Sequence, residues 1–214
     1  LAQAMYERLG RADWANPVLW SVVTLASLLT LTGIDYPTYF SGAQFIHFLL
    51  GPAVVALAWP LWERRSALRR HWLALLLAAL LGGSVASGSA VLLAWAVGLP
   101  HEVVLSLAPK SVTAPVAMGI ADKIGGIPAL AAVFAVVTGM VGALSGRTLF
   151  AWLGIKSDEA GWMASGFALG TAAHGIGAAR ALQVNADAGA YAGLALGVQV
   201  LLAALLLPLA FRIF

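Results

Sequence analysis

The chain has 214 residues, of which 61% are hydrophobic and only 10% are charged, and its formal net charge is +3. Because soluble domains carry about 25% charged residues, this composition excludes an ordinary soluble domain and indicates a protein that lies in a lipid bilayer. The absence of cysteine excludes disulfides, thiolate metal sites and cysteine nucleophiles.

The N-terminal segment, residues 1–16, is polar and short. It lacks an apolar core before a small-residue cleavage site, so it does not form a signal peptide. Because the sequence starts at Leu1 rather than at methionine, we expect further sequence, including one more membrane span, to precede it. The scattered basic residues favour a role in membrane orientation over binding of nucleic acid.

Several segments are long and apolar enough to cross a bilayer, which takes roughly 20 apolar residues. In chain order the predicted spans cover residues 17–34, 43–62, 72–97, 127–146 and 189–211. Two further segments, 102–122 and 158–182, have spanning length but are rich in small and polar residues. The sequence therefore predicts an all-α polytopic membrane protein. We expect one membrane domain over 1–214, with scaffold spans at 17–62 and a core around the two polar segments.

The basic loops predict an orientation. The densest of them, "ERRSALRRH" at 63–71, should be cytoplasmic. If 102–122 enters the membrane from outside and returns, Arg147 and Lys156 also lie in the cytoplasm and 158–182 enters from inside. The two polar segments would then be re-entrant from opposite faces, as in the inverted repeats of elevator-like transporters. The alternative, in which both segments cross fully and both basic residues lie outside, stays open.

The sequence itself contains little trace of such a repeat. A shift of sixty residues aligns 107–120 with 167–180, and only Ala108 and Ala168 are identical. The parallel is positional, because each segment has a broken polar centre and is followed by an apolar span.

The segment "SLAPKSVTAPVAMG", residues 106–119, contains two prolines and a lysine in apolar surroundings. Pro109 and Pro115 each lack an N–H donor and predict a broken helix. A break exposes amides at the start of the next helix, where the helix dipole favours an anion. Lys110, Ser111 and Thr113 lie at that break and are candidate substrate-binding residues. The alternative is that Lys110 reaches a membrane surface and snorkels into water.

The second polar segment reads "SGFALGTAAHGIGAARAL". Its glycines, Gly170 and Gly175 among them, weaken a helix and allow close backbone approach. Thr171 and His174 are three residues apart and share a helix face. Ionisable groups in membrane segments indicate a functional site, and Arg180 is included on that ground. The alternatives are that His174 is a hydrogen-bonded packing residue and that Arg180 marks a helix end.

The positions of the acidic residues limit the class of ligand that the interior of the protein can bind. All nine lie in predicted ends or loops, so no span has a carboxylate at its centre. Interior donors and cations favour an anionic ligand, although coupling to sodium through backbone carbonyls remains open. A separate glycine series at Gly189, Gly193 and Gly197 is a small-residue stripe, which we interpret as helix packing or as the contact of a homo-oligomer, a dimer in particular.

Three motifs resemble the LrgB/CidB family of bacterial membrane proteins, including its YohK-like members. They are "LAPKSVTAPVAMGIADKIGGIPALAAVFAVVTGMVGA", "LLGPAVVALAWPL" and "GTAAHGIGAARAL", and the resemblance covers about residues 16–211. The match holds residue by residue at Lys110, Ser111, Thr113, Pro115, Gly170, Thr171, His174, Gly175 and Arg180.

The resemblance implies two functions. Bacterial members are described as modulators of murein hydrolase export and cell death, paired with a small holin-like protein of the LrgA/CidA type. A plant relative is the plastid glycolate/glycerate transporter, and some bacterial pairs are linked to pyruvate uptake. The resemblance also implies a multi-pass protein of the bacterial inner membrane.

We therefore expect a transporter of small monocarboxylates, with no cofactor and no metal, whose coupling ion is either a proton or sodium. The alternative is an antiholin-like membrane protein that does not transport. An intramembrane hydrolase is less favoured, because no acid lies near Ser111, Ser165 or His174 to orient the histidine. We do not expect an enzyme.

Overall fold

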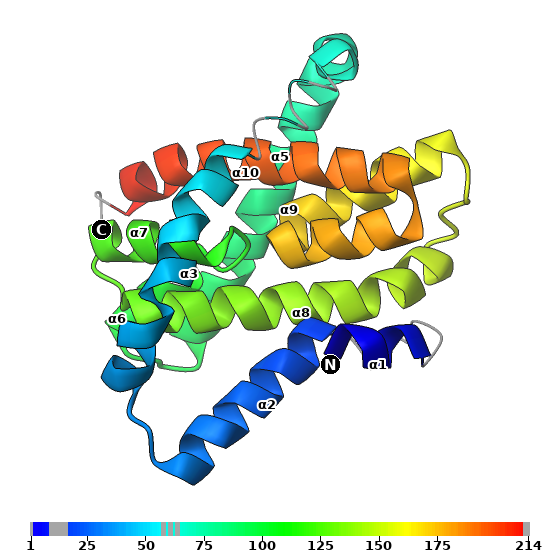
Figure 1. Cartoon of the computed structure of the whole chain (residues 1–214). Helices are drawn as coiled ribbons and strands as arrows, with labels where there is room; N and C mark the ends of the chain where they lie inside the picture. Colours follow the sequence, from blue (N-terminus) through cyan, green and yellow to red (C-terminus); the bar gives the residue numbers. More distant parts are fainter. Residues whose placement is uncertain (1, 9–16, 57–58, 60–61, 63–64, 212–214) are drawn as a thin grey trace. The chain divides into compact units, whose positions relative to one another are not determined.

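The computed structural model describes residues 2–8, 17–56, 59, 62 and 65–211. Within these ranges the chain forms helices and turns and no strand, in agreement with the predicted all-α class (Figure 1). The helices fall into two compact units, Leu1–Ala56 and Leu57–Phe214. A single membrane domain over the whole chain stays a prediction.

The first unit contains α1 (Ala2–Arg8), α2 (Pro17–Thr32) and α3 (Tyr36–Ala56). The chain turns after α2 at Gly33, whose φ of 67° is a left-handed conformation that glycine adopts readily. Asp35 then starts α3 by accepting a hydrogen bond from the backbone N–H of Thr38 at 3.2 Å. The predicted span 17–34 is thus helical to residue 32. The span 43–62 is helical to residue 56, and most of its remainder lies outside the described residues.

The second unit is built on three long helices, α5 (Arg65–Ala96), α8 (Pro128–Trp152) and α10 (Ala186–Ala210). Within the described ranges these are the helices that are long and apolar enough to cross a bilayer. At a rise of 1.5 Å per residue, 25 residues extend about 37 Å, which exceeds the hydrocarbon thickness of roughly 30 Å. The predicted apolar spans at 72–97, 127–146 and 189–211 are confirmed as apolar helices.

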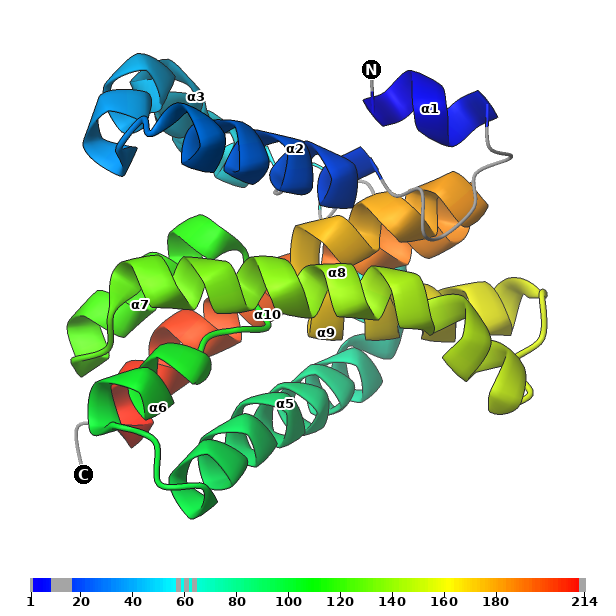
Figure 2. The same ribbon diagram turned by 90° about the horizontal axis from the view of Figure 1, so that it is seen from below.

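The first polar segment is broken, as its prolines predict. Helix α6 (His101–Leu107) ends before Pro109, and α7 (Ala114–Ile124) starts with Pro115 in its first turn, where a missing N–H costs no helical bond. The Ser106 hydroxyl donates to the Glu102 carbonyl at 2.6 Å and accepts from the Ile127 N–H at 2.7 Å. The chain therefore returns, after α7, to the end of α6 (Figure 2).

The second polar segment is a helical hairpin. Helix α9 (Glu159–Val184) reverses at His174, which has φ 42° and ψ −133°. A Cβ added at Gly177 would meet the carbonyl of Leu169, eight residues earlier, although these positions lie about 12 Å apart along a straight helix. The two arms, 159–173 and 175–184, consequently lie against each other (Figure 1).

Small residues join α10 to the first arm of α9. A Cβ at Gly166 would collide with the carbonyl of Ala188, and a Cβ at Gly170 would collide with that of Ala192. Both pairs advance by four residues in the same direction, so the two helices run parallel at close backbone approach. Of the predicted glycine stripe, Gly189 packs on Leu182 of the second arm.

The remaining glycines of that stripe, Gly193 and Gly197, are buried within the chain itself. A role for the stripe in an oligomer stays a prediction.

Helix α8 passes both broken segments (Figure 2). Ala131 and Ala135 pack in a buried cluster with Ala117 of α7. Further along α8, a Cβ at Gly142 would meet Ala173 of the α9 hairpin, and a Cβ at Gly146 would meet Leu169. One straight helix thus serves as the surface on which both segments pack.

The parallel contact of α9 and α10 can be tested with Gly166→Ala. The added methyl meets backbone rather than a flexible side chain, so we expect the free energy of unfolding in detergent to fall by about 1–3 kcal/mol. The matched control is Gly119→Ala on α7, which has nothing within 4 Å of its new Cβ. The control should be neutral or slightly stabilising, because alanine is the better helix former. Equal stability of both variants would contradict the close approach.

Candidate functional site

Four buried side-chain oxygens within the described part of the chain have no hydrogen-bond partner. They belong to Ser111, Thr113, Thr171 and Gln199. A buried polar atom left without a partner costs about 1–3 kcal/mol, so native proteins contain few of them and each calls for an explanation such as a bound ligand or water. Their concentration in two broken segments and one neighbouring helix marks a candidate site.

These oxygens come from three elements that meet α5. Ser111 and Thr113 lie in the turn between α6 and α7, Thr171 precedes the reversal of α9, and Gln199 lies in the middle of α10. A Cβ at Gly82 of α5 would approach Thr171 Cγ2 at 3.2 Å, and one at Gly83 would overlap the Gln199 amide. The glycine pair of α5 therefore makes room for both polar side chains.

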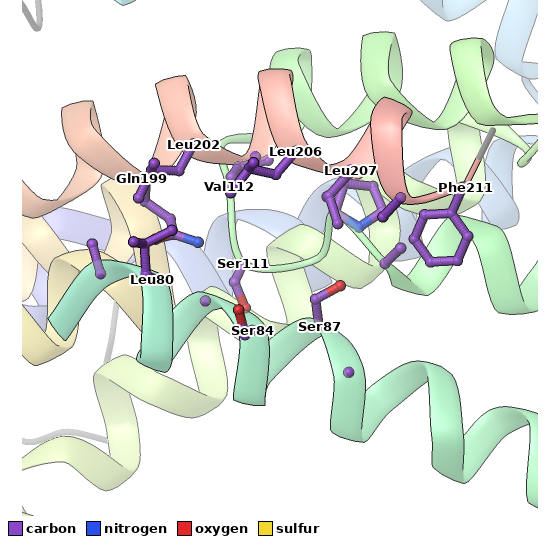
Figure 3. Close-up of a pocket in the computed structure, with 17 residues that line it drawn as sticks. Leu80, Ser84, Ser87, Ser111, Val112, Gln199, Leu202, Leu206, Leu207 and Phe211 are labelled. Carbon is purple, nitrogen blue, oxygen red and sulfur yellow. The ribbon is translucent and has the colours of Figure 1, made fainter. Parts of the chain in front are cut away.

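A cavity of about 260 Å³ lies between α5 and α10 and is bordered by the α6–α7 turn. Figure 3 shows Ser84 and Ser87 on the α5 side, Gln199 on the α10 side, and Ser111 of the turn directed toward the α5 serines. The remaining lining is apolar and includes Pro109 and several leucines of α10. The cavity thus combines an apolar wall with a few hydroxyls and one amide, which is the usual character of a small-ligand site.

The start of α7 directly follows the lining residues Ser111 and Val112 in the chain and carries backbone donors, although no residue of α7 lines the cavity. Thr113 is the N-cap residue, yet its hydroxyl makes no capping bond to the helix. The first N–H groups of a helix have no partner within it, and the helix dipole makes that end positive. In α7 Pro115 supplies no N–H, so fewer than four such donors are present. The unpartnered Ser111 hydroxyl, 6% exposed, lies two residues before this helix start. Hydroxyls and backbone amides together are donors suited to a carboxylate.

His174 stabilises the reversal of α9 and does not line the cavity. Its ring is buried, and Nε2 lies 2.8 Å from the carbonyl of Ala135, to which it donates because a carbonyl only accepts. Gly139, one turn further along α8, leaves room for the ring. The φ of 42° is a conformation that favours glycine, and such strain persists where the surroundings hold it.

Only some of the predicted site residues lie at the cavity between α5 and α10. Ser111 lines the cavity, and Thr171 packs on Gly82 beside it. Lys110 is half-buried between the lining residues Pro109 and Ser111 but does not line the cavity itself. Neither Lys110 nor His174 lines a described cavity, and the ring of His174 bonds to the carbonyl of Ala135.

The other predicted residues have positions in packing or elsewhere. Pro115 lies in the first turn of α7, and Gly170 contacts Ala192. Gly175 follows the reversal with open space around it, and Arg180 lines a different cavity. Among the described residues, no group of three or more His, Cys, Asp or Glu side chains is arranged to hold a metal ion.

Sequence reasoning missed Gln199, Ser84 and Ser87. Gln199 is the only strongly polar residue in "GLALGVQVLLAALLL", and a lone amide in an apolar span is a signal of the same kind as an ionisable one. The serines lie in "GGSVASGSA", whose small residues permit close approach to another helix.

Long apolar helices, two broken segments and an internal, mostly apolar cavity with a few polar side chains define a membrane protein of the helical class. The model of the LrgB-like family matches residues 1–213, and the chain belongs to this family. The resemblance to LrgB/CidB proteins is confirmed.

Relatives match along most of their length. The uncharacterized protein YxaC of Bacillus subtilis is 36% identical over 167 residues, 78% of this chain and 71% of YxaC. An uncharacterized protein of Haemophilus influenzae is 34% identical over 198 residues, 92% of this chain and 84% of its own. The holin-like protein CidB of Staphylococcus aureus is 28% identical over 200 residues, 93% of this chain and 85% of CidB. No solved structure gives a significant match.

The strain at the α9 reversal predicts which of two His174 variants is the more stable. His174→Gly and His174→Ala both lose the ring and its hydrogen bond, but only glycine adopts the backbone conformation without strain. We expect the glycine variant to be more stable than the alanine variant by about 1 kcal/mol, measured by denaturant unfolding in detergent. At the exposed helical position Ala179, glycine should instead be the less stable residue. The same order at both positions would contradict the reversal.

Proposed function

We propose that this chain is a secondary transporter for small monocarboxylates of the pyruvate, glycolate and glycerate class, and that it acts in the bacterial cytoplasmic membrane. What supports this function best is the set of buried oxygens without partners, contributed by both broken segments and by α10. A transported ligand can satisfy such groups while it is bound and leave them to water when it departs. Permanent internal hydrogen bonds would prevent this exchange.

The chemistry of the lining favours an organic acid with one further oxygen. Ser111 and the amides at the start of α7 are donors for a carboxylate. Gln199 has both a carbonyl and an NH₂ group and can bind either a 2-oxo or a 2-hydroxy oxygen. Among the described residues, no acidic side chain lines the cavity, and Lys110, between two lining residues, would supply positive charge. A volume of about 260 Å³ fits a molecule of a few carbon atoms.

Movement in this proposal involves the broken segments. The α6–α7 segment would be re-entrant from the outer face and the α9 hairpin from the cytoplasmic face, as an inverted repeat. Alternating access would follow when the bundle that carries both segments moves as a body, as in elevator-like transporters. The small-residue contacts of α9 with α10 favour such rigid-body movement, because these helices pack backbone against backbone.

Uptake by proteoliposomes tests the site. We expect labelled pyruvate, glycolate or glycerate to enter, and Ser111→Ala and Gln199→Leu each to reduce uptake by about tenfold or more, as loss of a hydrogen bond to a charged ligand predicts. The matched control is Ser145→Ala on α8, whose exposed hydroxyl bonds only to the Val141 carbonyl. Uptake by both site variants at the control level would contradict the proposal.

The role of Lys110 is tested by separate variants. Lys110→Ala should lower uptake, and Lys110→Arg should restore part of it, because the proposed role needs positive charge near the cavity. The control is Lys123→Ala, an exposed lysine at the end of α7. Full uptake by Lys110→Ala would assign the ammonium to the membrane surface.

A second candidate function rests on the names of relatives, several of which are holin-like proteins CidB. In this candidate the chain modulates murein hydrolase activity and lysis together with a small LrgA/CidA-type partner and does not transport. It predicts effects on membrane integrity that need the partner and are unchanged by Ser111→Ala and Gln199→Leu. Absence of uptake for all three acids, together with such effects, would favour this function over transport.

A further inference from the structure

A second and larger cavity lies at the C-terminal end of α8. It has a volume of about 480 Å³ and is formed by the end of α8, the connection to α9 and both arms of the α9 hairpin. None of its lining residues lines the cavity between α5 and α10. It is therefore a separate site, and the transport proposal does not use it.

The lining of this cavity has a single sign of charge. It is lined by Arg147 of α8, Lys156 of the connection and Arg180 of the second arm, and by no acidic side chain within the described part of the chain. Arg180 already has an interaction within the chain. The two other cations, Arg147 and Lys156, are exposed, and both line this cavity.

The acidic residues nearest in sequence, Asp158, Glu159 and Asp187, are not among the described residues that line this cavity. Asp158 accepts a hydrogen bond from the Gly161 N–H at 2.8 Å and so caps α9. Glu159 lies in the first turn of α9, where the helix dipole attracts its charge, and it does not line the cavity. Arg147 and Lys156 both belong to the lining, and no carboxylate does among the described residues, so an anion with more than one negative charge is favoured there.

The rest of the lining indicates what kind of chemical group is attached to the anion. Phe150, Trp162, Leu169 and Val184 give the cavity an apolar interior behind its charged residues. The site also lies at the end of an apolar helix long enough to cross a bilayer. Basic pockets between membrane helices bind the phosphate of anionic lipid headgroups. A phosphate with an attached apolar group fits both the charge and the walls.

We propose that this cavity binds a phosphate-bearing anion, with the phosphate between Arg147 and Lys156. The source is an anionic phospholipid or a soluble phosphate ester, which share this chemistry. Because Leu169 and Ala181, on opposite arms of the hairpin, both line the cavity, a bound ligand also contacts both arms. Binding then stabilises the hairpin that carries Thr171 and His174 near its reversal, and so regulates the mobility of that hairpin.

Thermal unfolding of the purified protein in lipid nanodiscs tests this site. The probes are inorganic phosphate added to phosphatidylcholine nanodiscs, and phosphatidylglycerol mixed into the nanodiscs without phosphate. We expect the unfolding midpoint to rise by at least about 2 °C with one probe. A rise with phosphate identifies a soluble ligand, and a rise with phosphatidylglycerol alone identifies a lipid headgroup.

The variant Arg147→Gln/Lys156→Gln should abolish this rise. The control pair Lys123→Gln/Arg69→Gln removes the same charge at exposed residues outside the cavity and should keep it. In a second measurement, bound ligand should slow the reaction of Lys156 with an amine-specific reagent at least threefold, while Lys123 is unaffected. An equal rise in both variant pairs, no rise with either probe, or unchanged Lys156 reactivity would overturn the proposal.

Discussion

In an apolar interior every polar group needs a partner, and this requirement accounts for most of the second unit. Where the helix is broken, the chain satisfies its own groups: Ser106 bonds Glu102 and Ile127, and His174 bonds Ala135. These bonds hold the α6–α7 turn and the α9 reversal in place. The unpartnered oxygens are then informative: of the four residues, Ser111 and Gln199 line one cavity, and Thr171 packs on Gly82 beside it.

Glycine and alanine give the second unit its close packing. They let α10 lie against the first arm of α9 and leave room on α8 for the imidazole of His174. Large apolar side chains face outward instead, as Leu81, Leu92 and Leu93 of α5 do. This distribution is the inverse of a soluble protein's and suits a lipid environment, in which close approach of helices replaces hydrophobic burial as the source of association.

The long helices could be predicted from sequence because hydropathy and length act locally, and the break at Pro109 and Pro115 follows from the chemistry of proline. The reversal at His174 could not be located, because four nearby glycines were equally plausible turning points and the residue that reverses is not one of them. Gln199 was missed because its significance depends on contact with α5, far away in the sequence. Lys110 was grouped with His174 because each lies in a broken polar segment, and a site that includes both stays a prediction.

The most direct measurement of the central site uses the absence of native cysteine. A single Ser111→Cys variant in proteoliposomes carries one thiol, at the cavity between α5 and α10. If a small carboxylate binds there, a small charged thiol reagent should modify this cysteine, and pyruvate, glycolate or glycerate should slow the modification at least severalfold, while an uncharged analogue of the same size should not. A reaction rate that is the same with and without each acid would contradict a carboxylate site at Ser111.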